Sequence, residues 1–476
     1  MYRNQCKPLI KNPNPLDSDM LRESIHLFLD GYRFGVADLN DFSSISMRLL
    51  RDHAADPSIE VVWFHSAVTF LTAKFAAQLP LKRVRLAEDI FQRLVSSTDV
   101  CGALKRIAVL APIVYLLTDL VVEKRHLELE GHVQGFLERV VAYVGICFID
   151  ASKREESEDY GLSGLGSCFM ETIRAWMVDK IGIDHEEVCL KAFFPIVSDE
   201  VRSGMVKMGC GVGYVAGVVM CEALMLKLYF KFGSVTSRVE LQKDVHDLAV
   251  QTMNGFRNIF FFDILFRVLL EPVLPVTHLL NSDDACLLQK VLHDAVMMMD
   301  FSFLNPQTGI QIPGDWLKDL SVKWLFVADN AISSVRKDGD QAKAISYVNA
   351  FSESCITSRL IEWITNHIGI EGKVFEPDFP NPVAFIMTLV ISSSEWMLHA
   401  EEQGAKMFEC EISKRLAKEV VHRSNLDDCE FEMADVAETE YLADDIMINA
   451  TATDGSRKRK EGAKDDHKNQ CKLVKY

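Results

Sequence analysis

The sequence predicts an all-α fold, and three observations support that prediction. Apolar residues recur every three or four positions through most of residues 18–423, which is the period of a helix with one buried face. No segment of that region shows the alternating pattern of a half-buried strand. Hydrophobic residues make up 49% of the chain, enough for a large core. We expect about sixteen to twenty helices joined mostly by short loops, and a disordered C-terminal tail.

The first third of the chain contains strong helix start and stop patterns. Asp56 followed by Pro57 predicts a helix start, with Asp as the N-cap and Pro at the first helical position. Pro112 should kink a helix that begins after Thr98 or Asp99, because proline cannot donate the backbone hydrogen bond. The helices expected here cover 18–34, 38–55, 58–78, 81–95, 100–122 and 126–149.

Helical patterns continue after residue 167. Asp184 and Glu187 have the spacing of a capping box. Asp263, Arg267 and Glu271 recur every fourth residue, which predicts one polar stripe with ion pairs along a phenylalanine-rich helix. The remaining expected helices cover 168–180, 237–253, 256–270, 282–299, 316–337, 340–354, 359–368 and 382–423.

The domain organisation follows from composition. Residues 1–17, with three prolines, form an extended arm without the apolar core of a secretory signal. Residues 18–423 form one helical region. It is interrupted by a charged and glycine-rich segment, 150–167, expected to be an exposed loop, and by connectors at 305–314 and 369–381. Residues 424–476 form the acidic, then basic, tail.

The most apolar stretch, residues 208–226, has two interpretations. It is close to the roughly 20 residues that span a bilayer, and Gly213 and Gly217 form the GxxxG pattern of packed membrane helices. Against a span, its four glycines dilute the hydrophobicity, and Glu222 would be costly in hydrocarbon. We favour a soluble helix covered on all sides, in which the glycines let neighbouring backbones approach. An integral membrane protein anchored by 208–226 is the alternative.

Charge and cysteine usage narrow the function classes. The formal charge of −17 argues against direct nucleic-acid binding and favours protein partners, including basic ones. The twelve cysteines contain no CxxC pair, so buried free thiols fit better than a metal or disulfide framework. We find no HExxH, GxSxG, Walker A or dinucleotide-binding pattern. We therefore expect no catalytic residues, no metal site and no cofactor. The six dispersed tryptophans are expected to anchor the core.

The tail carries two candidate interaction segments. Residues 426–454 are rich in acids and contain no Lys or Arg. Apolar residues interleaved with these acids are typical of a segment that folds in a partner's groove, the alternative being an unbound tail; they are Phe431, Met433, Tyr441, Leu442 and Ile446. Downstream, Arg457, Lys458, Arg459 and Lys460 form a compact basic cluster of the kind that directs nuclear import. A solvated charge run is the simpler interpretation of that cluster.

The succession of amphipathic helices over about 18–423 resembles the architecture of the armadillo and HEAT α-solenoids, although no clean repeat of about 40 residues aligns. The resemblance implies an irregular α-solenoid and a non-enzymatic scaffold or adaptor that binds proteins along a helical surface. With the basic cluster, it predicts a nuclear subunit, for example of a chromosome, DNA-repair or RNA-processing assembly.

Overall fold

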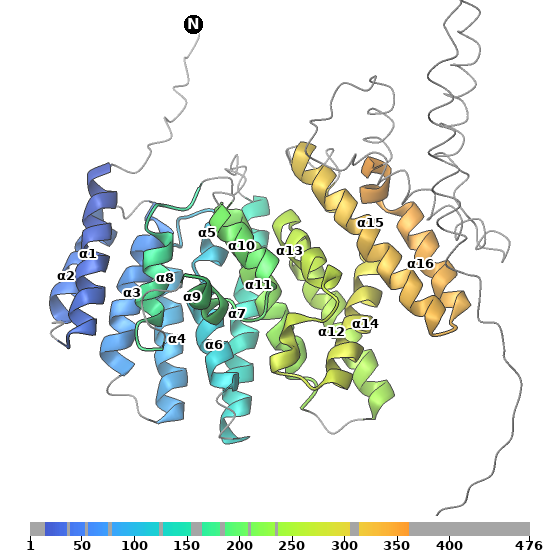
Figure 1. The fold of residues 1–476 in the computed structure, drawn as a ribbon, viewed down its shortest axis with the longest axis horizontal. Coiled ribbons are helices and arrows are strands. Elements are labelled where there is room, and N and C mark those ends of the chain that lie inside the picture. Colours follow the sequence, from blue (N-terminus) through green and yellow to red (C-terminus); the bar gives the residue numbers. More distant parts are fainter. Residues whose placement is uncertain are drawn as a thin grey trace, which may run out of the picture. The chain divides into compact units, whose positions relative to one another are not determined.

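The computed structural model describes residues 15–35, 39–52, 56–74, 79–122, 127–153, 164–180, 186–207, 211–233, 237–304 and 314–360. These ranges form sixteen α-helices and two short 3-10 helices (Figure 1). They contain no β-strand, only an isolated antiparallel bridge between Gly164 and Gly211. The prediction of an all-α fold is therefore confirmed for the part of the chain that the structure describes.

The helices have the following bounds: α1 Pro15–Arg33, α2 Leu39–Asp52, α3 Ile59–Lys74, α4 Pro80–Ser97, α5 Ala103–Ala108, α6 Ala111–Val122, α7 Leu127–Lys153, α8 Phe169–Met177, α9 Glu186–Phe193, α10 Asp199–Lys207, α11 Val212–Tyr229, α12 Arg238–Gly255, α13 Ile259–Leu270, η1 Pro275–His278, α14 Ser282–Met297, η2 Ser302–Leu304, α15 Gly314–Lys337 and α16 Gln341–Glu353. Residues 355–360 are also helical.

Three expected boundaries differ from the observed ones. Helix α3 begins at Ile59, and the hydroxyl of Ser58 accepts from the backbone N–H of Val61 at 3.3 Å, so Ser58 takes the capping place predicted for Asp56. Pro112 lies in the first turn of α6, where its missing N–H costs nothing, and the predicted kink is a break between α5 and α6. Helix α7 continues to Lys153, three residues into the expected loop.

Short side chains cap several other helices, as the unpaired N–H groups of a first turn require. Ser237 and Glu240 form a reciprocal capping box at the start of α12. Asn258, Asn281 and Asp340 accept backbone hydrogen bonds at the starts of α13, α14 and α16. The expected capping residue Asp184, the connector 369–381 and the helix 382–423 lie outside the described residues.

Most helices contact their neighbours in the sequence. Helix α2 packs between α1 and α3, α3 contacts α4, and α15 contacts both α14 and α16. Two helices depart from this order: α8 packs back on α1 and α3, while α11 contacts α5, α6, α7, α12 and α13. Helix α11 therefore joins the helices before it to those after it (Figure 1).

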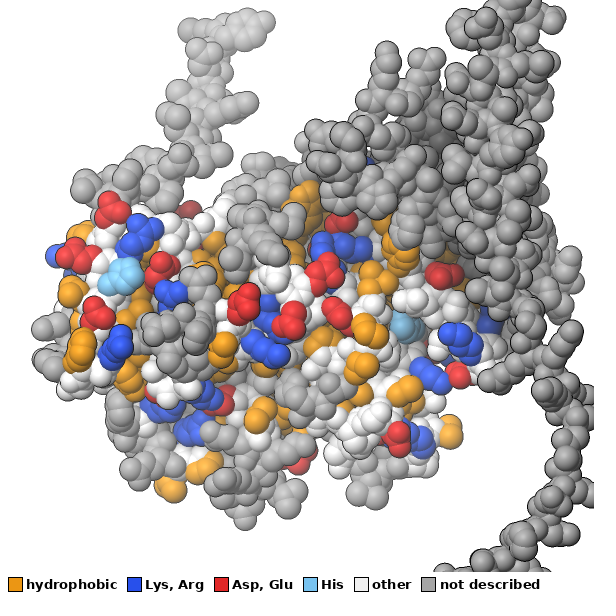
Figure 2. Space-filling model, viewed as in Figure 1, with side chains coloured by type: hydrophobic (Ala, Val, Ile, Leu, Met, Phe, Trp, Pro, Cys, Tyr) orange, Lys and Arg blue, Asp and Glu red, His pale blue; other side chains and the backbone are white. Residues whose placement is uncertain are grey.

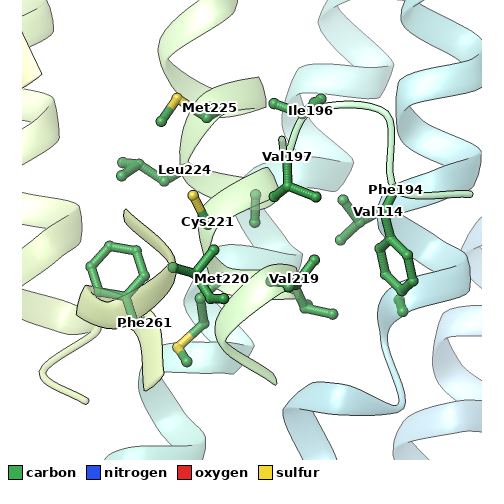
Figure 3. Close-up of a cluster of buried hydrophobic side chains, with 14 of the residues drawn as sticks. Val114, Phe194, Ile196, Val197, Val219, Met220, Cys221, Leu224, Met225 and Phe261 are labelled. Atoms are coloured by element: carbon green, nitrogen blue, oxygen red, sulfur yellow. The ribbon is translucent and has the colours of Figure 1, made fainter. Parts of the chain in front are cut away.

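Helix α11 is the innermost element of the core. Every residue from Val212 to Leu226 is buried, which explains why this helix is apolar on all sides. Its residues Val219, Met220, Cys221 and Leu224 face a set of buried side chains from other elements (Figure 3). That set includes Val114 of α6, Phe261 of α13, and Phe194, Ile196 and Val197 from the turn after α9.

The glycines of the GxxxG pattern allow α11 and α13 to touch. A Cβ built on Gly217 would lie 2.5 Å from the carbonyl oxygen of Phe260, and one on Gly213 would lie 2.5 Å from the Phe260 ring. Neither position has room for a methyl group. The pattern thus serves helix packing inside the fold, as the buried-helix interpretation expected.

Gly217→Ala should lower the free energy of unfolding by about 1–3 kcal/mol, because the new methyl would collide with a backbone atom of α13. Denaturant unfolding followed by circular dichroism measures the change. The control is Gly135→Ala in α7, where nothing lies within 4 Å of the added methyl. Helix propensity alone should stabilise that variant by about 0.5–1 kcal/mol. Equal effects of the two substitutions would contradict the close packing.

Candidate functional site

The sequence-predicted site residues divide into two groups. Gly213, Gly217 and Glu222 all lie on α11 and are buried in the core. The tail residues lie outside the described part of the chain. They are the five proposed partner-binding positions Phe431, Met433, Tyr441, Leu442 and Ile446, and the basic cluster Arg457, Lys458, Arg459 and Lys460. The geometry that can be built around the first group is a buried carboxylate and a neighbouring network of ion pairs.

Glu222 is only 1% exposed and is held by the turn between α9 and α10. Its Oε1 atom accepts a hydrogen bond from the backbone N–H of Ile196 at 3.0 Å, while its Oε2 atom is buried without a partner. Burial raises the pKa of Glu222 to about 8, although the Ile196 N–H, Arg202 and the Val197 N–H all act in the opposite direction. The carboxyl therefore keeps its proton at neutral pH, which is how an acid is tolerated in an apolar helix.

Arg202 fixes the same turn from the other side. Its guanidinium donates to the carbonyl oxygens of Phe194, at 2.8 Å, and Val197, and to Asp199 at 2.5 Å. The side chain is buried apart from this contact to the exposed Asp199. The turn that covers Glu222 is thus held by an arginine that satisfies two backbone carbonyls.

Glu222 should make the fold less stable as pH rises. The unfolded carboxyl ionises near its ordinary pKa of 4.5, whereas the folded one retains its proton up to about pH 8. Between these values the unfolded state binds fewer protons, so stability should fall by about 1.4 kcal/mol per pH unit from this group.

Glu222→Gln replaces the protonated carboxyl with an uncharged group of the same shape. We expect its free energy of unfolding to depend less on pH between 5 and 8, and to exceed that of the wild type at pH 8. Denaturant unfolding at several pH values tests this. Glu23→Gln, at an exposed position of α1, is the control for removing one acid. If both variants keep the wild-type pH dependence, Glu222 is ionised in the fold.

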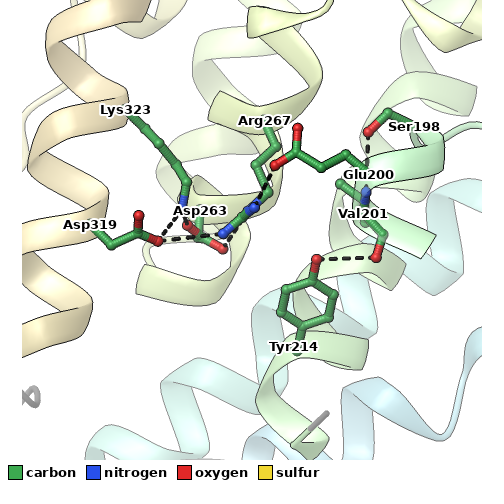
Figure 4. A network of polar contacts seen from close by, with 8 residues as sticks. All are labelled: Ser198, Glu200, Val201, Tyr214, Asp263, Arg267, Asp319 and Lys323. Carbon is green, nitrogen blue, oxygen red and sulfur yellow. Dashed lines mark hydrogen bonds and ion pairs between the residues drawn. The ribbon is translucent and has the colours of Figure 1, made fainter. Parts of the chain in front are cut away.

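A network of charged side chains joins α10, α13 and α15 beside the central helix (Figure 4). Asp263 of α13 accepts from Lys323 of α15 at 2.5 Å and from Arg267 at 3.2 Å. Arg267 also contacts Glu200 of α10 at 2.9 Å and Asp319 at 3.4 Å, and Lys323 pairs with Asp319. This network confirms the predicted ion pairing of Asp263 with Arg267.

The rest of the network differs from the prediction. Glu271 forms no ion pair with the described residues; it ends α13, and its carbonyl oxygen accepts from Gln289 at 3.4 Å. Glu200, Asp319 and Lys323 were not predicted. The four-residue spacing of Asp319 and Lys323 is visible in the sequence, but nothing in it shows that they face α13. Burial is concentrated at Asp263 and Lys323, whose side chains are 7% and 10% exposed.

Asp263→Asn should destabilise the fold by about 3–5 kcal/mol, because Lys323 would stay buried without its closest carboxylate. Asp319→Asn is the control: it touches the same two cations, but its side chain is 59% exposed, so a loss of about 0–1 kcal/mol is expected. Denaturant unfolding compares the two. The double variant Asp263→Leu with Lys323→Met should recover much of the loss. A double variant less stable than Asp263→Asn would contradict this account.

No group of three or more His, Cys, Asp or Glu side chains that could hold a metal is found among the described residues. Of the seven cysteines described as free, five are buried, Cys286 is exposed and Cys355 is half-buried. Buried Trp63, Trp176 and Trp324 each donate their indole N–H, to Val109, Trp63 and Thr357 respectively, as expected of core anchors.

Two helical segments in the described part are long and apolar enough to cross a membrane. Val212–Tyr229 is 89% buried by the surrounding helices, whereas Glu130–Ile149 of α7 is 39% buried. The first segment is the predicted membrane stretch, and the fold already covers it. Such helices also occur in the cores of soluble proteins.

Comparison of the chain with protein-family models, with curated proteins and with solved structures finds no match.

Proposed function

We propose that this protein is a non-enzymatic nuclear scaffold or adaptor subunit that binds protein partners. The observation that carries the proposal is the sequential packing of the helices, in which α1 to α4 and α13 to α16 mostly contact their neighbours. A stack of this kind buries one face of each helix and leaves the outer faces as a long surface. We further infer that the stack is an irregular α-solenoid of the armadillo or HEAT type.

The outer surface supports protein binding more than nucleic-acid binding. On the face drawn in Figure 2, the described acidic and basic side chains are interspersed with apolar ones. A nucleic-acid-binding surface would instead gather Lys and Arg along one stripe or face. With a net charge of −17, the chain would also repel phosphate backbones at long range.

The tail supplies the other two parts of the proposal. The acidic segment with Phe431, Met433, Tyr441, Leu442 and Ile446 would bind partners through its apolar side chains. The cluster from Arg457 to Lys460 would direct the chain to the nucleus. A possible chromosome, DNA-repair or RNA-processing assembly is the setting we propose.

Replacing Arg457, Lys458, Arg459 and Lys460 by alanine should shift a fluorescent full-length fusion from the nucleus to the cytoplasm. Quantitative imaging of the nuclear-to-cytoplasmic ratio measures the effect. The control removes the same number of positive charges from the same tail, with alanine at Lys464, Lys468, Lys472 and Lys475. If the two variants behave alike, the cluster is not an import signal.

Alkaline-carbonate extraction of the same cells tests the membrane alternative. A scaffold should be released into the supernatant. Retention in the membrane pellet would favour anchoring by residues 208–226 and would overturn the buried role of α11.

A further inference from the structure

Helices α2, α3 and α4 enclose a hollow of about 440 Å³ near the start of the described chain. This volume is in the range of pockets that bind ligands. We call it the α2–α4 hollow. Its lining consists of Met47, Leu50 and Arg51 from α2, His65 and Ser66 from α3, and Gln92, Arg93, Ser96 and Ser97 from α4.

The charge of the α2–α4 hollow is opposite to that of the chain. Two arginines and no acid line it, although acids outnumber bases in the sequence by 68 to 51. Neither Arg51 nor Arg93 forms an ion pair with the residues that the structure describes. By contrast, Arg83 on the same α4 helix pairs with Asp119 at 2.9 Å. The two guanidinium groups that converge here therefore have their donors available.

The floor of the hollow is polar but uncharged. His65 is 7% exposed, and its Nδ1 shares a hydrogen bond of 2.9 Å with the hydroxyl of Ser46. Burial and the nearby Arg93 both lower the pKa of His65, so the ring is neutral at physiological pH. The positive charge of the hollow thus comes from the two arginines at its rim.

The serine hydroxyls determine which groups a ligand can present. Ser66, Ser96 and Ser97 each donate to the carbonyl oxygen one turn back, at 2.8 Å. Their oxygens therefore remain as acceptors for ligand N–H or O–H groups. Met47, which is 44% exposed, and Leu50 add an apolar wall. A ligand that fits carries an oxyanion, hydrogen-bond donors and an apolar group.

We propose that the α2–α4 hollow binds an acidic segment of a protein partner. An extended peptide combines carboxylates for Arg51 and Arg93, backbone N–H groups for the serine oxygens, and an apolar side chain for Met47 and Leu50. Arginine pairs commonly recognise acidic or phosphorylated motifs in this way, by charge-assisted hydrogen bonds. The identity of the occupant as a protein rests on the proposed scaffold function, whereas the anion preference rests on the hollow alone.

The test measures fluorescence anisotropy with the full-length chain and a fluorescein-labelled peptide of alternating glutamate and leucine. The same peptide with glutamine in place of glutamate is the ligand control. The wild type should bind the glutamate peptide and not the glutamine one. Arg51→Gln and Arg93→Gln should each weaken binding by about tenfold or more, since each removes hydrogen bonds to a charged group.

Arg85→Gln is the matched control variant, because Arg85 is an exposed arginine of α4 that does not line the hollow. It should change the affinity less than twofold. An equal loss in all three variants would mean diffuse electrostatic attraction and would overturn the site. Binding of inorganic phosphate as tight as that of the peptide would mean a site for free anions, which also overturns the proposal. Circular dichroism verifies that each variant is folded.

These outcomes are independent of the tests of the proposed function. A chain that stays in the cytoplasm would end the nuclear proposal but leave the peptide measurement unchanged. Equal binding of the glutamate and glutamine peptides would remove the anion site while leaving nuclear import and tail binding intact.

Discussion

The complete burial of α11 is the constraint on which the rest of the described fold depends. A helix without a polar face is stable in water only when neighbours cover all of its sides. Helices α5, α6 and α7 do so from the preceding part of the chain, and α12 and α13 from the following part. Gly213 and Gly217 set how near α13 can come, because the Phe260 backbone and ring occupy the space of their missing side chains. The order of helices elsewhere is sequential, so this helix links two otherwise local stacks.

This constraint also decides how charge is placed. An ionised carboxylate beside α11 would lose its hydration without gaining a close cation, and the fold meets this by keeping Glu222 protonated and bound to the Ile196 N–H. One layer further out, Asp263 and Lys323 remain charged because they neutralise each other, and Arg267 extends the pairing to the exposed Glu200. The polar groups therefore change from neutral, to paired, to solvated with distance from the central helix, as the local cost of an isolated charge decreases.

The sequence predicted those features that depend on local patterns. Helical periodicity located most helices to within a few residues, and the all-round apolar composition of 208–226 predicted its buried position. Local chemistry was less decisive at boundaries, since Asp56 and Ser58 are both good caps and only the path of the chain selects Ser58. Contacts between distant segments had no sequence pattern at all. Ile196 lies 26 residues from Glu222, and nothing in either segment indicates that a backbone N–H from one satisfies the acid of the other. The α2–α4 hollow is of the same kind, because Arg51 and Arg93 look like ordinary surface residues until three helices bring them together.

An acidic protein that binds an acidic segment at one place gains specificity from its own charge. The net charge of −17 repels anionic partners from most of the surface, and at physiological ionic strength this repulsion acts over about 8 Å. Within the α2–α4 hollow, two arginines without described acidic partners reverse the local potential, and direct hydrogen bonds to them are screened less than long-range repulsion. An acidic ligand is therefore bound only where it can reach both guanidinium groups, and partners that present one carboxylate elsewhere are rejected. Long-range repulsion and short-range recognition together would let a scaffold select one acidic segment among many.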